Sequence, residues 1–205
     1  MIRTKICGVT RVEDGIAAAR CGADAVGMVF VEASARCVSI KRATEISRAL
    51  PPFVTRVALF MNPDSTQVRD VLNRVPIDVI QFHGAETADF CGQFDRPWIK
   101  ALALSSSDPG TYERYADADA ILLDTHAGYS MGGSGQTFDW SDIPMLPRPL
   151  ILAGGLTPDN VAEACRNANP AAVDVSSGVE RRPGVKSDSL IQRFINTVDE
   201  VNRDG

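Results

Sequence analysis

The chain has 205 residues, a formal net charge of −5 and 44% hydrophobic residues. This apolar content excludes wholesale disorder and is enough for one buried core, so we expect a single domain over residues 1–205. The acidic balance disfavours a nucleic-acid or anionic-membrane binder, but it leaves room for an anionic small molecule at a locally positive site.

Eight short apolar runs recur almost evenly from one end of the chain to the other. Most are short and rich in β-branched residues, which is typical of buried parallel strands rather than of helices. The expected strands span residues 2–7, 24–30, 56–61, 78–83, 98–104, 120–124, 150–153 and 172–175.

Amphipathic segments separate most of these runs, and several begin near a residue that can cap a helix. The T-R-V-E pattern at Thr10 is a capping box, which predicts a helix over residues 12–21 that ends before Gly22. Pro158 is expected just inside the start of a helix that runs to about residue 168. The other expected helix starts are Ser39, Asp64 or Ser65, and Ser187 or Asp188.

Alternating strands and helices indicate a parallel sheet with right-handed crossovers. Eight such units predict a single-domain α/β protein with the (β/α)8 TIM-barrel fold, whose active site lies at the carboxyl ends of the strands. An open doubly wound sheet is the alternative, but no G-x-G-x-x-G motif follows the first run. The longest irregular stretch, residues 125–137, is a candidate lid or ligand loop.

The alternation of side chains along each strand predicts which residues face the barrel interior. One face of the first strand carries Lys5 and Cys7, and one face of the last carries Asp174 and Ser176. On the fourth and sixth strands the corresponding sets are Gln81 with His83 and Leu122 with Asp124. Because charges inside a barrel must be compensated, we expect Lys5 and Asp174 to be paired.

Two strand ends carry residues suited to proton transfer. Cys7 ends the first strand in K-I-C-G, where it is either a small buried hydrophobe or a thiol whose pKa Lys5 lowers. Asp124 ends the sixth strand after four apolar residues, and it is either a turn cap or an acid–base carboxylate.

Small residues follow the last two strands, as Gly154–Gly155 and as Ser176–Ser177–Gly178. Each group alone is a weak signal, because turns need glycine anyway. Together they favour a phosphate site built from backbone N–H groups and hydroxyls. Arg36, in the loop after the second strand, is either solvated or the bidentate ligand of a carboxylate.

Cysteine and histidine usage disfavours disulfide and metal chemistry. None of the five cysteines forms a C-x-x-C pair, and the only histidines are His83 and His126, so we expect no metal site. The segment MIRTKICGVT has no signal-peptide features, and no run approaches the roughly 20 apolar residues of a membrane span. We therefore expect a reduced, cytoplasmic protein, and nothing in the sequence indicates a protein partner.

Taken together, these motifs resemble the phosphoribosylanthranilate isomerase family. The segments that carry the resemblance follow the family's order and are K-I-C-G-V-T, D-A-V-G-M-V-F, S-A-R-C-V-S, Q-F-H-G, L-L-D-T, G-G-S-G-Q-T-F-D-W, L-A-G-G-L-T-P-D-N-V and V-D-V-S-S-G-V-E. The resemblance implies a (β/α)8 barrel of tryptophan biosynthesis that performs a cofactor-free Amadori rearrangement. The implied substrate is the small molecule N-(5′-phosphoribosyl)anthranilate, and the implied product is 1-(o-carboxyphenylamino)-1-deoxyribulose 5-phosphate.

The resemblance also implies a role for each matching residue. Cys7 would be the general base, Asp124 the general acid, and Arg36 the ligand of the anthranilate carboxylate. Asp174 would have a supporting role near the sugar hydroxyls. The residues implied around the phosphate are Gly133 to Gly135, Gly154, Gly155, Ser176, Ser177 and Gly178.

Three positions depart from the family pattern. Ala35 stands where a proline is expected, Cys37 stands where an aromatic residue is common, and Phe82 replaces the leucine of Q-L-H-G. We expect these changes to bear on the loop that positions Arg36, and not on the type of reaction.

Two other classes of function remain open from the sequence, and the first is another phosphosugar enzyme of the barrel class. The related isomerase of histidine biosynthesis uses aspartates on the first and fifth strands, where this chain has Cys7 and the carboxylate-free run W-I-K-A-L-A-L. A metal-dependent pentose-phosphate epimerase is disfavoured by the scarcity of histidines. The second alternative is a barrel that binds a phosphorylated metabolite without turning it over.

Overall fold

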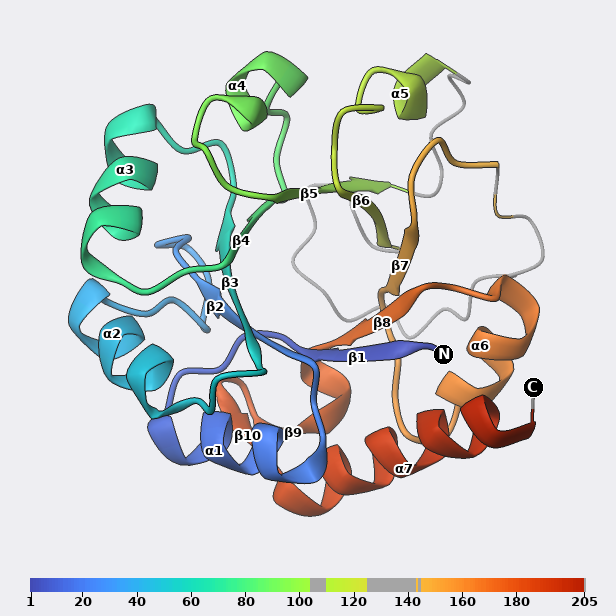
Figure 1. The fold of residues 1–205 in the computed structure, drawn as a ribbon. Coiled ribbons are helices and arrows are strands. Elements are labelled where there is room, and N and C mark those ends of the chain that lie inside the picture. The colour runs from blue at the N-terminus through green and yellow to red at the C-terminus, as the bar shows by residue number, and fades with distance from the viewer. Residues whose placement is uncertain (104–109, 125–142, 144, 205) are drawn as a thin grey trace.

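The computed structural model of the protein describes residues 1–103, 110–124, 143 and 145–204, and within them eight parallel strands close into a barrel (Figure 1). Each strand pairs with its neighbours in chain order, and β1 pairs with β8 to close the ring. The strands are β1 (Arg3–Ile6), β2 (Ala25–Val29), β3 (Thr55–Phe60), β4 (Val79–Phe82), β5 (Trp98–Ala103), β6 (Ala120–Asp124), β7 (Leu150–Ala153) and β8 (Ala172–Val175). The predicted TIM-barrel fold is confirmed.

Helices surround the barrel and connect most of the strands (Figure 1). They are α1 (Val12–Cys21), α2 (Ile40–Ala49), α3 (Ser65–Arg74), α4 (Ala88–Gly92), α5 (Gly110–Glu113), α6 (Val161–Ala168) and α7 (Asp188–Asp204). The chain ends lie side by side, because the Ile2 N–H donates to Asn202 Oδ1 at 2.6 Å and Asn202 Nδ2 donates to the Ile2 carbonyl. The last helix is therefore fastened to the first strand.

Local capping signals explain several helix ends. Ser39 accepts a hydrogen bond from the Arg42 N–H, and Asp64 accepts one from the Gln67 N–H, as their N-cap positions predict. Gly22 ends α1 in the left-handed conformation with φ of 103°, which an L side chain rarely adopts.

Two capping predictions are wrong. The N-cap of α1 is Arg11, because the Thr10 hydroxyl donates to the Gly184 carbonyl at 2.5 Å and so is used in a tertiary contact. Pro158 lies in a turn before α6, which begins at Val161. In that turn Asn160 Oδ1 accepts from the Thr157 N–H at 2.8 Å.

The structure also contains elements that the sequence reading did not anticipate. After β8 the chain forms a short 3₁₀ helix, η2 (Ser177–Val179), and then an antiparallel hairpin of β9 (Glu180–Arg182) and β10 (Val185–Lys186). Gly184 in the hairpin turn has φ of 76°. The Pro183–Gly184 pair is a turn signal that could have indicated this hairpin.

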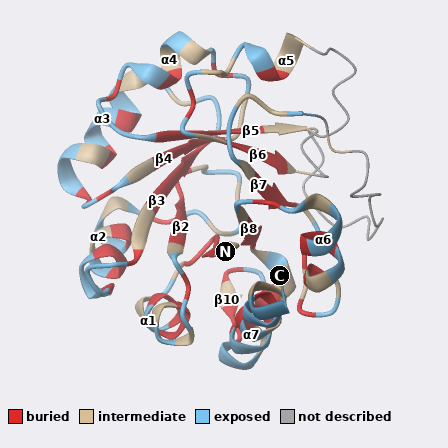
Figure 2. Cartoon of the chain, turned by 45° about the vertical axis from the view of Figure 1, so that its right-hand side comes forward, coloured by how far each residue is buried: buried red, intermediate tan, exposed pale blue. Residues whose placement is uncertain are grey.

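The strands divide the hydrophobic core into an inner and an outer part, and Figure 2 shows the buried strands inside a ring of helices whose outer faces are exposed. The inner cluster consists of Ile99, Ala101, Leu122, Ile151 and Ala153. Residues of the opposite parity, such as Ile80 and Val173, join helix residues in the large outer cluster. The predicted strand parity is confirmed.

Phe82 belongs to the outer part of the core. Its ring lies within 6.4 Å of the rings of Phe60, Phe90 and Phe94, centroid to centroid. The leucine-to-phenylalanine departure therefore extends an aromatic cluster between strands and helices and does not alter the inner face of β4.

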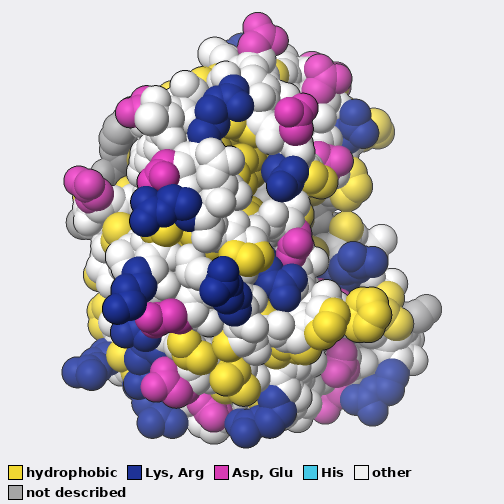
Figure 3. All heavy atoms as spheres, turned by 60° about the vertical axis from the view of Figure 1, so that its left-hand side comes forward, with side chains coloured by type: hydrophobic (Ala, Val, Ile, Leu, Met, Phe, Trp, Pro, Cys, Tyr) yellow, Lys and Arg dark blue, Asp and Glu magenta, His cyan; other side chains and the backbone are white. Residues whose placement is uncertain are grey.

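The outer surface carries charges of both signs. Figure 3 shows Lys and Arg side chains interspersed with Asp and Glu over one side of the molecule. None of the helices among the described residues has the length and apolar content needed to cross a membrane.

Candidate active site

The residues with candidate chemistry lie at the carboxyl ends of the strands. Cys7 directly follows β1, Asp124 is the last residue of β6, Gly154 follows β7, and Ser176 follows β8. Because all eight strands are parallel, these ends meet at one rim of the barrel.

An ion pair links the two strands that close the barrel. Lys5 and Asp174 are register partners on β1 and β8, and Lys5 Nζ lies 2.9 Å from Asp174 Oδ1. Both side chains are at most 8% exposed. Burial alone would lower the pKa of Lys5, but the Asp174 carboxylate and the Cys7 thiol outweigh it, so the pKa is raised. The predicted pairing is confirmed.

Cys7 lies beside this ion pair and is itself buried, at 5% exposed. Burial raises the pKa of the Cys7 thiol, the negative charge of Asp174 raises it further, and Lys5 and Lys186 lower it. The net shift is upward, so the expected depression of this pKa is wrong. Lys5 acts in the expected direction, but desolvation and Asp174 outweigh it.

Arg36 reaches this rim from the loop between β2 and α2. Its side chain passes over Gly8, where an added Cβ would lie 2.5 Å from Arg36 Cδ and 2.9 Å from Ser176 Oγ. Gly8 also has φ of 71°, so a side chain here would be strained. The glycine after Cys7 therefore leaves room for Arg36 and Ser176 to lie against the end of β1.

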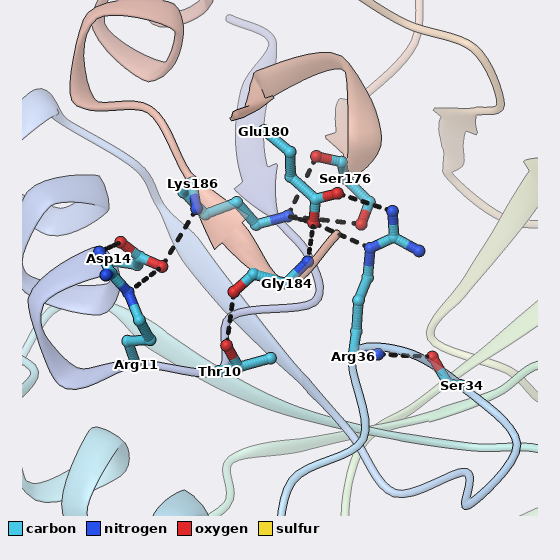
Figure 4. Close-up of polar contacts among 9 residues, drawn as sticks. All are labelled: Thr10, Arg11, Asp14, Ser34, Arg36, Ser176, Glu180, Gly184 and Lys186. Atoms are coloured by element: carbon cyan, nitrogen blue, oxygen red, sulfur yellow. Dashed lines mark hydrogen bonds and ion pairs between the residues drawn. The ribbon is translucent and has the colours of Figure 1, made fainter. Parts of the chain in front are cut away.

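The β9–β10 hairpin supplies two charged groups next to Arg36 (Figure 4). Glu180 accepts hydrogen bonds from Arg36 Nε at 2.8 Å and from Arg36 Nη2 at 2.7 Å. Lys186 Nζ donates to Glu180 Oε1 at 2.9 Å and to the Ser176 carbonyl at 3.0 Å. These contacts hold the pKa of Glu180 below its usual value despite its burial.

Asp124 lies near the histidine that directly follows β4. His83 Nε2 is 3.4 Å from Asp124 Oδ2, and His83 Nδ1 is 3.2 Å from the Gln81 side-chain amide nitrogen. Since an amide nitrogen only donates, Gln81 favours the tautomer of neutral His83 that carries its proton on Nε2, facing Asp124.

The glycines after the last two strands allow tight loops. Gly154 and Gly155 have φ of 87° and 64°, a region that favours glycine. A Cβ at Gly178 would overlap the Leu156 carbonyl oxygen, so the loops after β7 and β8 touch at this point. Ser177 is exposed, whereas Ser176 is partly buried. Gly133 to Gly135, His126 and the expected loop over 125–137 lie outside the described residues.

Two functional candidates escaped the analysis of the sequence. Glu180 stood in the V-D-V-S-S-G-V-E motif without a role, and Lys186 was not considered. A charged residue on each side of a Pro–Gly turn is a common surface pattern, so local sequence gave no reason to place them beside Arg36. Among the described residues, no group of three or more His, Cys, Asp or Glu side chains could hold a metal ion.

Residues 4–197 match the family model for N-(5′-phosphoribosyl)anthranilate (PRA) isomerase. The chain belongs to the phosphoribosylanthranilate isomerase family. It is accordingly an enzyme, an isomerase of the aldose–ketose type.

Individual members of the phosphoribosylanthranilate isomerase family match over nearly their full length. The N-(5′-phosphoribosyl)anthranilate isomerase of Pseudomonas fluorescens is 50% identical over 200 residues, which cover 96% of this chain and 98% of the relative. The crystal structure of phosphoribosyl anthranilate isomerase from Thermotoga maritima is 42% identical, with a TM-score of 0.87, and covers 98% of this chain and 100% of its own.

A further crystal structure shows a family member with a ligand. It is phosphoribosyl anthranilate isomerase in complex with reduced 1-(o-carboxyphenylamino)-1-deoxyribulose 5-phosphate. That chain is 40% identical, with a TM-score of 0.83, and the match covers 98% of this chain and 100% of that one.

Proposed function

We propose that this protein converts N-(5′-phosphoribosyl)anthranilate to 1-(o-carboxyphenylamino)-1-deoxyribulose 5-phosphate in tryptophan biosynthesis, with Asp124 as general acid and Cys7 as general base. The observation that carries the proposal is the family match over residues 4–197, within which the family's base and acid motifs lie at the carboxyl ends of β1 and β6, on one rim of the barrel. The relative bound to the reduced product supports a small phosphorylated ligand.

The first chemical step opens the sugar ring. Asp124 in its protonated form donates a proton to the ring oxygen, the bond from that oxygen to C1′ breaks, and the nitrogen lone pair forms a Schiff base. His83, 3.4 Å from Asp124 Oδ2, interacts with one carboxyl oxygen and so favours placing the acidic proton on the other. Asp124 leaves this step as a carboxylate.

The second step removes the proton from C2′. The Cys7 thiolate takes this proton, the electron pair forms the C1′–C2′ double bond, and the iminium nitrogen is neutralised to give an enolamine. Tautomerisation of the enolamine to the ketone completes the isomerisation without net gain or loss of electrons. Burial and Asp174 raise the pKa of Cys7, and the nearby Lys5 and Lys186 are the groups that favour its thiolate form.

Each end of the substrate has a matching group at this rim. The Arg36 guanidinium suits the anthranilate carboxylate, because it can donate two parallel hydrogen bonds to it. The loops of Gly154 and Gly155 and of Ser176, Ser177 and Gly178 suit the phosphate, which backbone N–H groups and hydroxyls can hold. Asp174 is proposed to act near the sugar hydroxyls while paired with Lys5.

The test is a turnover assay with freshly prepared phosphoribosylanthranilate, in which loss of the substrate's fluorescence is followed and the product is trapped. Wild type, Cys7→Ala and Asp124→Asn are compared, with Glu45→Gln in an exposed ion pair on α2 as the control. We expect fast product formation by wild type and the control, and none above background by the two variants, which still bind reduced product. Binding without turnover by wild type would instead support a barrel that only binds a metabolite.

A further inference from the structure

Glu180 is the centre of a buried charge cluster next to Arg36. Its side chain is 4% exposed, and its carboxylate accepts from Arg36 Nε and Nη2, from Lys186 Nζ and from the Gly184 N–H, at 2.7 to 3.2 Å. Figure 4 shows Lys186 and Arg36 reaching this carboxylate from opposite sides. Both carboxylate oxygens are therefore committed to partners within the protein.

Among the described residues, the contact with Glu180 leaves one edge of the Arg36 guanidinium without a hydrogen-bond partner. A guanidinium can bind carboxylates along a side edge made of Nε and Nη2, and along an end edge made of Nη1 and Nη2. Glu180 occupies the side edge. Among the hydrogen bonds of the described residues, none involves Arg36 Nη1. A second carboxylate can therefore bind at the end edge while Glu180 stays in place.

The charge balance of the cluster also favours a second anion. Arg36 and Lys186 contribute two positive charges, and Glu180 contributes one negative charge. If Lys186 were absent, Glu180 would neutralise the guanidinium. With Lys186 bound to the same carboxylate, one positive charge remains for an incoming carboxylate.

The hairpin that bears Glu180 is itself fixed to the barrel. The Lys186 N–H donates to the buried Asp14 carboxylate at 3.1 Å, and the Thr10 hydroxyl donates to the Gly184 carbonyl. Arg11 pairs with the same Asp14 at 2.7 Å. The start of α1 thus holds the hairpin in place, and the hairpin in turn holds the Arg36 guanidinium. Glu180 and Arg36 are 144 residues apart in the sequence.

We propose that Glu180 is a positioning residue that holds Arg36 by its side edge, so that the end edge receives the ring carboxylate of the substrate. This proposal rests on the proposed function, in which Arg36 binds that carboxylate. In this proposal the Glu180–Lys186 pair causes the enzyme to prefer a substrate whose N-aryl group carries a carboxylate. Glu180 does not touch the reacting atoms in this arrangement.

The test compares two ligands that differ only in the ring carboxylate. They are reduced 1-(o-carboxyphenylamino)-1-deoxyribulose 5-phosphate and its analogue with an unsubstituted phenyl ring. Calorimetric titration gives the dissociation constant of each ligand for wild type, Glu180→Gln, Arg36→Met and the control Glu45→Gln. In wild type and the control, the carboxylate-bearing ligand is expected to bind more tightly.

Glu180→Gln keeps the size of the side chain but turns one acceptor into a donor facing the guanidinium or the ammonium. We expect it to weaken binding of the carboxylate-bearing ligand about tenfold, the loss of one charge-assisted hydrogen bond, and to leave the phenyl ligand unchanged. In the Arg36→Met background it should have no further effect on selectivity, because Glu180 acts through Arg36. If Glu180→Gln fails to fold, Glu180→Asp takes its place in the test. It keeps the charge but is one methylene shorter, and we expect it to lose the same selectivity.

Other outcomes overturn the proposal. Equal weakening of both ligands would mean that Glu180 only supports the fold, and tighter binding of the carboxylate-bearing ligand would mean that Glu180 competes with the substrate. Unchanged selectivity in Glu180→Gln and Glu180→Asp, with selective wild type, overturns this proposal alone. A wild type that binds neither ligand overturns the proposed function and this proposal with it.

Discussion

Lys5 and Asp174 face each other across β1 and β8, the two strands that close the barrel, and their side chains form a buried ion pair of 2.9 Å. The pair lies beside Cys7, and its two charges have opposite effects on the pKa of the Cys7 thiol. Asp174 raises the pKa of the Cys7 thiol, and Lys5 lowers it. One contact thus joins the closure of the barrel to the acidity of the proposed base.

We predict that Asp174→Asn destabilises the protein strongly. The substitution leaves the Lys5 ammonium buried without a counter-charge, which lowers the free energy of unfolding by about 3 to 5 kcal/mol. Urea denaturation measures the change. The control is Asp70→Asn, which breaks the exposed Asp70–Arg74 pair on α3 and should cost less than about 1 kcal/mol. Equal effects of the two substitutions would contradict this interpretation of the buried pair.

We predict that Lys5→Met moves the rising limb of the kcat/KM profile to higher pH. The proposed base acts as a thiolate, so activity rises as pH passes the pKa of Cys7, and removing a cation that lowers this pKa raises it. Asp174→Asn removes an anion and should move the limb the other way. The rate of Cys7 alkylation by iodoacetamide against pH, followed by mass spectrometry, reports the pKa without requiring turnover. Lys41→Met on the surface of α2 is the control, and an unmoved profile in Lys5→Met would exclude Lys5 from this role.

We predict that Glu86→Gln destabilises the protein and loosens the loop that follows β4. Lys100 is fully buried, and its ammonium lies 2.9 Å from Glu86 Oε2 and 2.5 Å from the Gly84 carbonyl oxygen. Glu86 also accepts from the Asn62 and Gly84 N–H groups, so the carboxylate fastens the segment next to His83. Its loss should lower the free energy of unfolding by about 3 kcal/mol and speed hydrogen exchange in this loop. Stability within about 0.5 kcal/mol of wild type would show that the carbonyl oxygens alone suffice for Lys100.

We predict that Gly178→Ala impairs substrate binding and stability together. The new methyl group would overlap the Leu156 carbonyl oxygen, so the loops after β7 and β8 would have to separate. Since both loops are proposed to hold the phosphate, KM should rise as the melting temperature falls. Gly92→Ala is the matched control, because no atom lies within 4 Å of its Cβ position and the residue is in α4. That substitution should be neutral or stabilise by up to about 1 kcal/mol. A wild-type KM in Gly178→Ala would show that the close approach of these two loops does not contribute to substrate binding.

Much of the fold could be predicted because its signals are local. The eight apolar runs became the eight barrel strands with ends shifted by at most a few residues, and side-chain alternation put Lys5 and Leu122 on the inner face. Caps such as Ser39 act within one turn of their own helix. Candidate catalytic residues could be located because parallel strands bring all their carboxyl ends to one rim.

The sequence by itself determined the order of strands and helices, the inner and outer faces and the strand ends that bear Cys7 and Asp124. Only the tertiary structure decided that Thr10 binds the distant Gly184 instead of capping its helix, and that Glu180 holds Arg36. It likewise decided that burial and Asp174 outweigh Lys5 at Cys7. Periodicity and caps act between near neighbours in the chain, whereas hydrogen-bond competition and pKa shifts depend on distances that exist only once the barrel has closed.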